Sequence, residues 1–110
     1  MDWRVRNDGA RLVAVPTGRV DEDSWKAFST HLNAAVNDAL VLAIPSLVID
    51  LSGLEYMTSK GLRALTLAKN EARGEVTIRL AAPNATMRRI LSISRYDMLF
   101  PVVDAVDPAS

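Results

Sequence analysis

The sequence predicts an α/β fold with a mixed sheet of four to five strands, an antiparallel first pair and helices packed mainly on one face. Short apolar runs of strand length alternate with longer segments in which apolar residues recur every three or four positions. The turn signal Asp8-Gly9 joins the first two runs, which favours a hairpin. A strand, a helix and a second strand then follow one another between Leu47 and Ala81, and such a connection makes the two strands parallel.

Length and composition limit the kind of protein. With 110 residues, of which 49% are hydrophobic, the chain can form one core, and we expect one domain over residues 1–110. The 13 basic and 13 acidic residues cancel, so nucleic acid is not an expected partner. The absence of cysteine excludes disulfides and thiolate chemistry. A signal-peptide pattern and an apolar run of roughly 20 residues are both missing, so we expect a cytoplasmic protein without direct membrane contact.

The first third is expected to form a hairpin and then a helix. Trp3–Arg6 and Arg11–Thr17 are the predicted strands, and Pro16 is expected at the end of the second because it cannot donate a ladder hydrogen bond. Ser24 is the predicted N-cap of the helix. The apolar residues that share one face of this helix are Trp25, Phe28, Leu32, Ala35, Val36 and Leu40. Pro45 ends the apolar segment that follows, and the helix boundary before it stays open.

The middle of the chain changes from strand to helix. Leu47–Leu51 suits a central strand buried on both faces, and from Gly61 the apolar residues fall at helical spacing. Ser59 therefore lies where a helix begins, and free backbone N–H groups there favour a hydroxyl oxygen or an anion. Gly61 is expected to leave this hydroxyl uncovered and to let a partner's backbone come close. An N-cap role for Thr58 or Ser59 is the simpler interpretation, and spacing alone does not overturn it.

The last third repeats the pattern of strand and helix. Gly74 is expected to end the central helix, and Glu75–Ala81 alternates as a half-buried strand does. Asn84 is the predicted N-cap of a third helix. Met98–Val103 is expected to be a short strand or a strand-like tail.

A family motif covers the change from strand to helix. Asp50-Leu51-Ser52-Gly53-Leu54, followed by Tyr56-Met57-Thr58-Ser59-Lys60-Gly61-Leu62-Arg63-Ala64-Leu65, resembles the signature of the STAS domain, the family of bacterial anti-sigma factor antagonists. The family tetrapeptide usually reads Asp-Ser-Ser-Gly, and its first serine is phosphorylated, which implies Ser59 as the phosphorylation site. The chain departs from this pattern at Thr58, where aspartate is usual, and at Lys60, where serine or alanine is usual.

A second segment, Gly18-Arg19-Val20-Asp21, resembles the Gly-x-x-Asp tetrapeptide that lies close to the phosphorylated serine in this family. A helix-flanking acid that suits the helix dipole is the alternative interpretation of Asp21. The residues expected to contact a partner are Asp21, Met57, Thr58, Ser59, Lys60, Gly61 and Leu62. An exposed patch around Met57 and Leu62 would suit dimerisation as well as kinase binding, so the oligomeric state stays open.

The resemblance implies a partner switch that regulates transcription. The unphosphorylated form would bind an anti-sigma factor serine kinase and so release a sigma factor. Phosphorylation at Ser59 would end this binding, and a PP2C-type phosphatase would restore it. ATP and magnesium would belong to the kinase, so this chain is expected to need no cofactor and to be no enzyme. The alternatives are a non-switching STAS subunit of a lipid-transport ATPase complex or stress-signalling scaffold, and a small-ligand domain with an anion pocket at the same helix N-terminus.

Catalytic motifs are not recognisable in the sequence. His31 is the single histidine and falls inside a predicted helix, without a second histidine or a cysteine with which to share a metal. A Ser-His-Asp arrangement of Ser59 and His31 lacks a nucleophile elbow. Ser59-Lys60-Gly61 lacks the upstream glycines of a phosphate-binding loop. Lys60 is interpreted as a solvated residue of the first turn with a second role as counter-charge to a phosphate.

Overall fold

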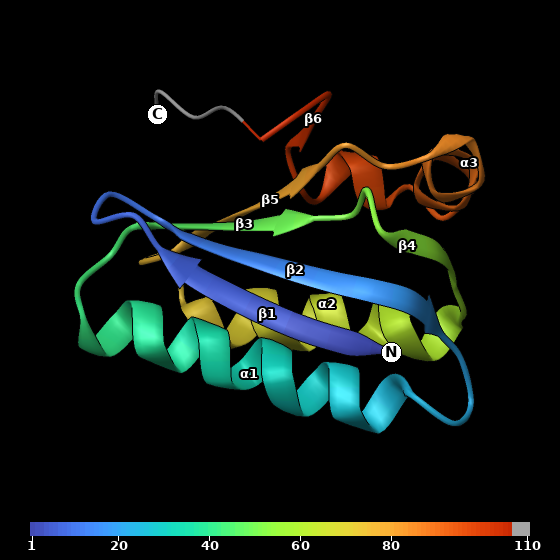
Figure 1. Cartoon of the computed structure of the whole chain (residues 1–110). Helices are drawn as coiled ribbons and strands as arrows, with labels where there is room; N and C mark the ends of the chain where they lie inside the picture. Colours follow the sequence, from blue (N-terminus) through green and yellow to red (C-terminus); the bar gives the residue numbers. More distant parts are fainter. Residues whose placement is uncertain (107–110) are drawn as a thin grey trace.

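A mixed sheet forms the centre of the computed structural model, which describes residues 1–106 (Figure 1). Along the chain the elements are β1 (Asp2–Asn7), β2 (Leu12–Val20), α1 (Trp25–Val41), β3 (Ser46–Asp50), β4 (Leu54–Met57), α2 (Ser59–Ala72), β5 (Thr77–Ala81), α3 (Ala85–Ile93), a 3-10 turn (Tyr96–Met98) and β6 (Val102–Val103). None of the helices within residues 1–106 combines the length and the apolar character needed to cross a bilayer.

The strands of the main sheet lie in the order β1-β2-β3-β5-β6, and β4 pairs with β2 outside this path. β1 and β2 are antiparallel, whereas the pairs β2–β3, β3–β5 and β5–β6 are parallel. The predicted antiparallel first pair, the central strand and the parallel crossover are therefore confirmed. β4 is missing from the prediction because its four residues show no clear alternation; the buried ones are Leu54 and Met57.

β2 is longer than the predicted strand, since it continues to Val20. Pro16 therefore lies inside β2 and not at its end, which corrects the prediction. The parallel pairing of β2 with β3 reaches Ala14, and its pairing with β4 begins at Gly18. Pro16 falls in the gap between these two neighbours, where a residue without an N–H breaks neither parallel ladder.

α1 and α2 cover one face of the sheet, whereas α3 lies beside β4 and away from this pair (Figure 1). Fully buried side chains fill the layer between the sheet and the two helices; they include Phe28, Leu32, Leu47, Ile49, Leu65 and Leu80. Burying one such side chain contributes about 1.5–3 kcal/mol. The helical faces predicted from apolar spacing are thus the ones that the core covers.

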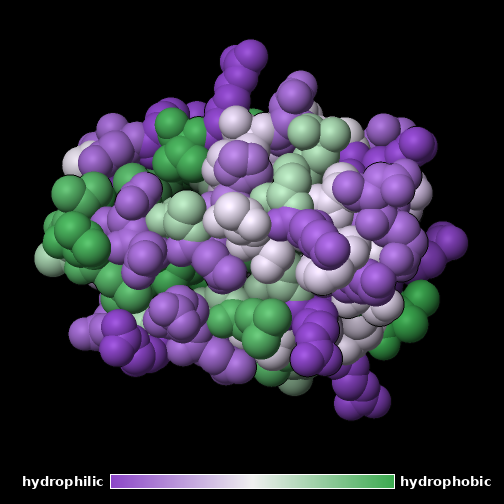
Figure 2. Space-filling view, turned by 90° about the horizontal axis from the view of Figure 1, so that it is seen from below, coloured by the Kyte–Doolittle hydropathy of each residue, from purple (hydrophilic) through white to green (hydrophobic). Residues whose placement is uncertain are grey.

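The predicted N-cap positions of the three helices and the predicted end of α2 before Gly74 agree with the structure, though of these N-caps only that of α3 forms through its side chain. Asn84 Oδ1 accepts from the Met87 N–H at 2.7 Å and caps α3 as predicted. α1 ends four residues before Pro45, and its end is apolar and exposed, with Val41 82% and Leu42 54% exposed. Figure 2 looks onto α1 and α2 and shows hydrophobic groups gathered at this end of the molecule.

Candidate functional site

Two strand ends bring the predicted site residues together. β4 runs parallel to the last residues of β2, and the Thr58 N–H donates to the Val20 carbonyl at 2.9 Å. The chain therefore leaves β2 at Asp21 beside the point where it leaves β4 for α2. An ion pair of 2.8 Å between Lys60 Nζ and Glu22 Oε2 links the two segments. The motif at 58–61 and the Gly-x-x-Asp tetrapeptide thus lie on neighbouring segments.

Ser59 is the first residue of α2 and is exposed. Thr58 occupies the N-cap position in an extended conformation, but its hydroxyl makes no capping hydrogen bond. The Thr58 Oγ1 atom is instead buried, and it has no hydrogen-bond partner within residues 1–106. Of the two neighbouring hydroxyl residues, Ser59 is therefore the one that a second protein can reach. The first N–H groups of α2, which have no intrahelical acceptors, point toward this end of the helix.

Met57 and Gly61 lie inside the fold, which corrects the expectation of an exposed patch. Met57 is 3% exposed, and Gly61 is also buried. A Cβ atom on Gly61 would collide with Met57 Cγ and would lie 2.8 Å from Val20 Cγ1. Gly61 therefore makes room for side chains of its own fold and not for a partner's backbone. Leu62, the other member of the expected patch, is half-buried against the core.

Asp21 organises the turn that leads into α1. Its Oδ1 accepts from the backbone N–H groups of Asp23 at 3.0 Å and Ser24 at 3.2 Å, and Oδ2 accepts from Arg19 Nε at 3.1 Å. Ser24 stands at the predicted N-cap position, but its hydroxyl accepts from the Asp21 N–H at 2.9 Å instead of capping α1. A hydrogen bond from the Ser24 hydroxyl lowers the pKa of the Asp21 carboxyl; burial opposes the shift, and the two N–H groups and Arg19 support it.

Replacing Asp21 by asparagine is expected to lower the melting temperature at about pH 7 and to have a smaller effect near pH 2, because the carboxylate stabilises the folded state only while it is ionised. The pKa of the folded state is below the ordinary value of 3.8, so this stabilisation is complete above 3.8 and is lost as the pH falls through the lowered pKa. Thermal unfolding at both pH values measures the effect. Asp23→Asn, on the exposed neighbour, is the matched control; an equal loss in both variants would contradict this role of Asp21.

A shallow hollow lies beside Ser59 on the surface of α2. Ser59, Lys60, Arg63, Thr66, Leu67 and Tyr96 line it. Arg63 follows Ser59 by four residues and so lies on the same side of the helix. It is exposed, and no ion pair involves it within the described part of the chain. Arg63 is absent from the predicted site, although its i, i+4 spacing from Ser59 is a signal that the sequence contains.

The remaining predicted side chains lie near α1. Trp25 is half-buried at the edge of the core, and Lys60 Nζ lies 5.1 Å from the centroid of its ring. Lys60 is therefore engaged by both Trp25 and Glu22, although its side chain is still 45% exposed. His31 is exposed on α1 and stacks on Trp3, with 5.4 Å between the ring centroids. Across residues 1–106, no cluster of histidine, aspartate and glutamate is arranged to hold a metal ion.

The fold and this site define a class of α/β domain in which a mixed sheet presents an exposed serine at the start of a central helix. A family model described as "Mlab, STAS domain" matches residues 3–103, so the chain belongs to the STAS domain family. The resemblance seen in the sequence is thereby confirmed. A comparison with curated proteins finds no match.

Solved structures of anti-sigma factor antagonists share this fold. One from Mycobacterium paratuberculosis is 27% identical, with 98% of this chain and 89% of that chain covered and a TM-score of 0.86. A STAS domain protein from Planctomyces limnophilus is 19% identical, with 94% and 89% covered and a TM-score of 0.80. SpoIIAA of Bacillus in its unphosphorylated form is 15% identical, with 96% and 90% covered and a TM-score of 0.67. The last two likenesses concern the fold alone.

Proposed function

We propose that this chain is an anti-sigma factor antagonist that works as a partner switch. Its unphosphorylated form would bind an anti-sigma factor serine kinase and release a sigma factor, and phosphorylation of Ser59 would end the binding. The observation that carries this proposal is the exposed hydroxyl at the first residue of α2. Further support comes from the similarity to the antagonist from Mycobacterium paratuberculosis, which is 27% identical.

The surroundings of Ser59 suit a phosphate on its hydroxyl. A phosphoserine carries about −1.5 to −2 charges at neutral pH, and the positive end of a helix dipole favours such an anion. Arg63 and Lys60 lie on the same hollow and supply positive charge. The phosphorylated domain would therefore stay folded, while the charge of its contact surface around Ser59 becomes more negative. ATP and magnesium belong to the kinase in this proposal, and a PP2C-type phosphatase would remove the phosphate.

The experiment that tests the proposal is phosphorylation of the whole chain, residues 1–110, by the anti-sigma factor kinases encoded in the same genome. Incubation with ATP and magnesium is expected to place one phosphate on Ser59, located by peptide mass spectrometry, and Ser59→Ala is expected to abolish it. Ser52→Ala is the matched control, because Ser52 is exposed in the turn between β3 and β4 and not at a helix start. Phosphate found only on Thr58 or only on Ser52 would contradict the assignment. A chain that stays unphosphorylated at all three residues would contradict it as well.

A non-switching STAS subunit of a lipid-transport ATPase complex is the second candidate. The matching family model is described as "Mlab, STAS domain", which does not name an anti-sigma factor antagonist, so this description is compatible with the alternative. Thr58 also stands where the switching family usually has aspartate. Purification of the tagged chain from its own cells distinguishes the two functions. A transporter ATPase that is retained equally by wild type and by Ser59→Asp would favour the subunit over the switch.

A further inference from the structure

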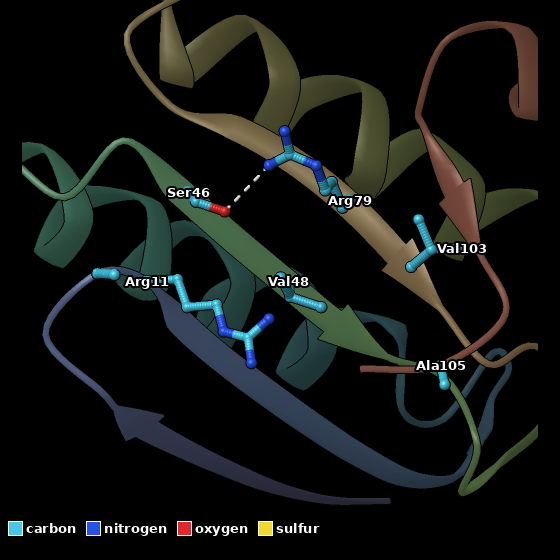
Figure 3. A pocket seen from close by; sticks show the side chains of 7 residues that line it. Arg11, Ser46, Val48, Arg79, Val103 and Ala105 are labelled. Carbon is cyan, nitrogen blue, oxygen red and sulfur yellow. Dashed lines mark hydrogen bonds between the residues drawn. The ribbon is translucent and has the colours of Figure 1, made fainter. Parts of the chain in front are cut away.

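The sheet face opposite α1 and α2 carries a cavity of about 370 Å³. Figure 3 shows its lining, which consists of Ala10, Arg11, Ser46, Val48, Arg79, Val103 and Ala105. Val48 and Ser46 on β3 form the floor, Arg79 stands on the neighbouring strand β5, and Arg11 lies directly before the first residue of β2. The cavity therefore combines an apolar surface with two guanidinium groups. It shares no lining residue with the hollow beside Ser59.

Among residues 1–106, Arg79 has no acidic partner for the charge that it places in this cavity. It is half-buried in the middle of β5, and its Nη1 donates to Ser46 Oγ at 3.1 Å. Within residues 1–106, this hydroxyl is the acceptor found for the guanidinium, and no ion pair includes Arg79. Asp104 lies in the sequence between the lining residues Val103 and Ala105, but its carboxylate pairs with Arg88 at 2.9 Å. A guanidinium has five N–H donors, and the bond to Ser46 uses one of them, so Arg79 has donors left for a ligand of this cavity.

Ser46 is a second group in the cavity that suits an oxyanion, and Arg11 shapes the wall beside it. The Ser46 hydroxyl accepts from Arg79, so its own hydrogen is still available for donation to a ligand. The Arg11 side chain is only 5% exposed and is held at 2.9 Å by Asp8 Oδ2, which fixes its position at the rim. Val48, Val103 and the alanines add an apolar wall on which a short hydrocarbon chain would pack.

We propose that this cavity binds a small amphipathic oxyanion, namely a carboxylate or a phosphate monoester on a short hydrocarbon chain. The oxyanion lies against Arg79 and receives a hydrogen bond from Ser46, while Arg11, whose charge is paired with Asp8, forms part of the wall. The hydrocarbon chain lies over Val48 and Val103. Such a site goes beyond the partner switch, because it is formed on a different face of the sheet and needs no phosphate on Ser59.

NMR titration of the whole 15N-labelled chain tests the proposal with three probes of equal chain length: hexanoate, hexyl phosphate and hexanol. Both anions are expected to shift the backbone amides of Ser46, Val48, Arg79 and Val103, whereas uncharged hexanol leaves them unchanged. The anion that binds with the lower Kd shows whether the site prefers a carboxylate or a phosphate. Equal binding of hexanol, or anion-induced shifts confined to Ser59 and Lys60, would overturn the proposal.

Variants test the role of Arg79 directly. Arg79→Gln is expected to weaken anion binding about tenfold or more, because it removes a charge-assisted hydrogen bond, and Arg79→Lys is expected to retain part of the affinity. Arg4→Gln, on the exposed surface of β1, is the matched control and should bind as wild type does. The amide spectrum of each variant shows whether it is folded. Unchanged binding by a folded Arg79→Gln would refute the site, and if this variant does not fold, the hexanol comparison on wild type decides.

Discussion

Phosphate on Ser59 is expected to weaken binding of the anti-sigma factor kinase about a hundredfold, and Ser59→Asp is expected to reproduce part of this loss. A charge placed at the centre of a contact surface loses its water when the partner docks, and about 3 kcal/mol of unfavourable interaction corresponds to a factor of about a hundred in Kd. Aspartate is the weaker substitute because it has one negative charge and fewer acceptor oxygens. Ser59→Ala should bind as wild type does. Isothermal titration calorimetry of the purified pair measures all three Kd values.

Two controls separate a change at the interface from a change in the fold. Ser52→Asp adds the same charge at an exposed position outside the start of α2, and it should leave the Kd unchanged. The melting temperature of Ser59→Asp should equal or exceed that of wild type, since an acidic residue in the first turn of a helix is favourable by about 0.3–1 kcal/mol. A kinase that binds Ser59→Asp and the phosphorylated chain as tightly as wild type would exclude the switch.

The fold could be predicted from the sequence wherever the pattern of one segment is sufficient. The run at 47–49 is apolar throughout and proves to be part of the central strand of the sheet, and the helical spacing after Gly61 defines the buried face of α2. β4 could not be predicted in this way because its partner is the end of β2, more than thirty residues earlier. The same pairing draws Gly18 to Val20 into β2, so one missed contact accounts for both errors.

The site shows the same division between local and distant information. Ser59 was predictable because the start of a helix is visible in the spacing of the residues that follow it. The burial of Met57 was not, because it depends on Val20, a residue of another strand that packs against Gly61 together with Met57. The Glu22–Lys60 ion pair likewise joins segments that meet only after β2 and β4 have paired. Contacts between distant segments therefore decided which of the motif residues lie on the surface.

Gly61→Val is expected to destabilise the fold by about 3 kcal/mol or more, since side-chain atoms would enter space that Met57 and Val20 already fill. The gain from replacing a glycine inside a helix is smaller, roughly 0.5 kcal/mol. Urea denaturation measures the free energy of unfolding. Asn70→Val is the matched control, because it adds the same β-branched side chain at an exposed position of the same helix and should cost well under about 1 kcal/mol.

The double variant Gly61→Val, Met57→Ala shows whether Gly61 is needed for packing inside the fold or for contact with a partner. Met57→Ala alone leaves a cavity and is expected to cost about 2–4 kcal/mol, whereas in the Gly61→Val background it frees the space that the valine needs. The double variant should therefore be more stable than the sum of the two single losses implies. If Gly61→Val were instead as stable as wild type and failed to bind the kinase, the contact surface for the partner, and not the packing of Met57 and Val20, would require a glycine at this position.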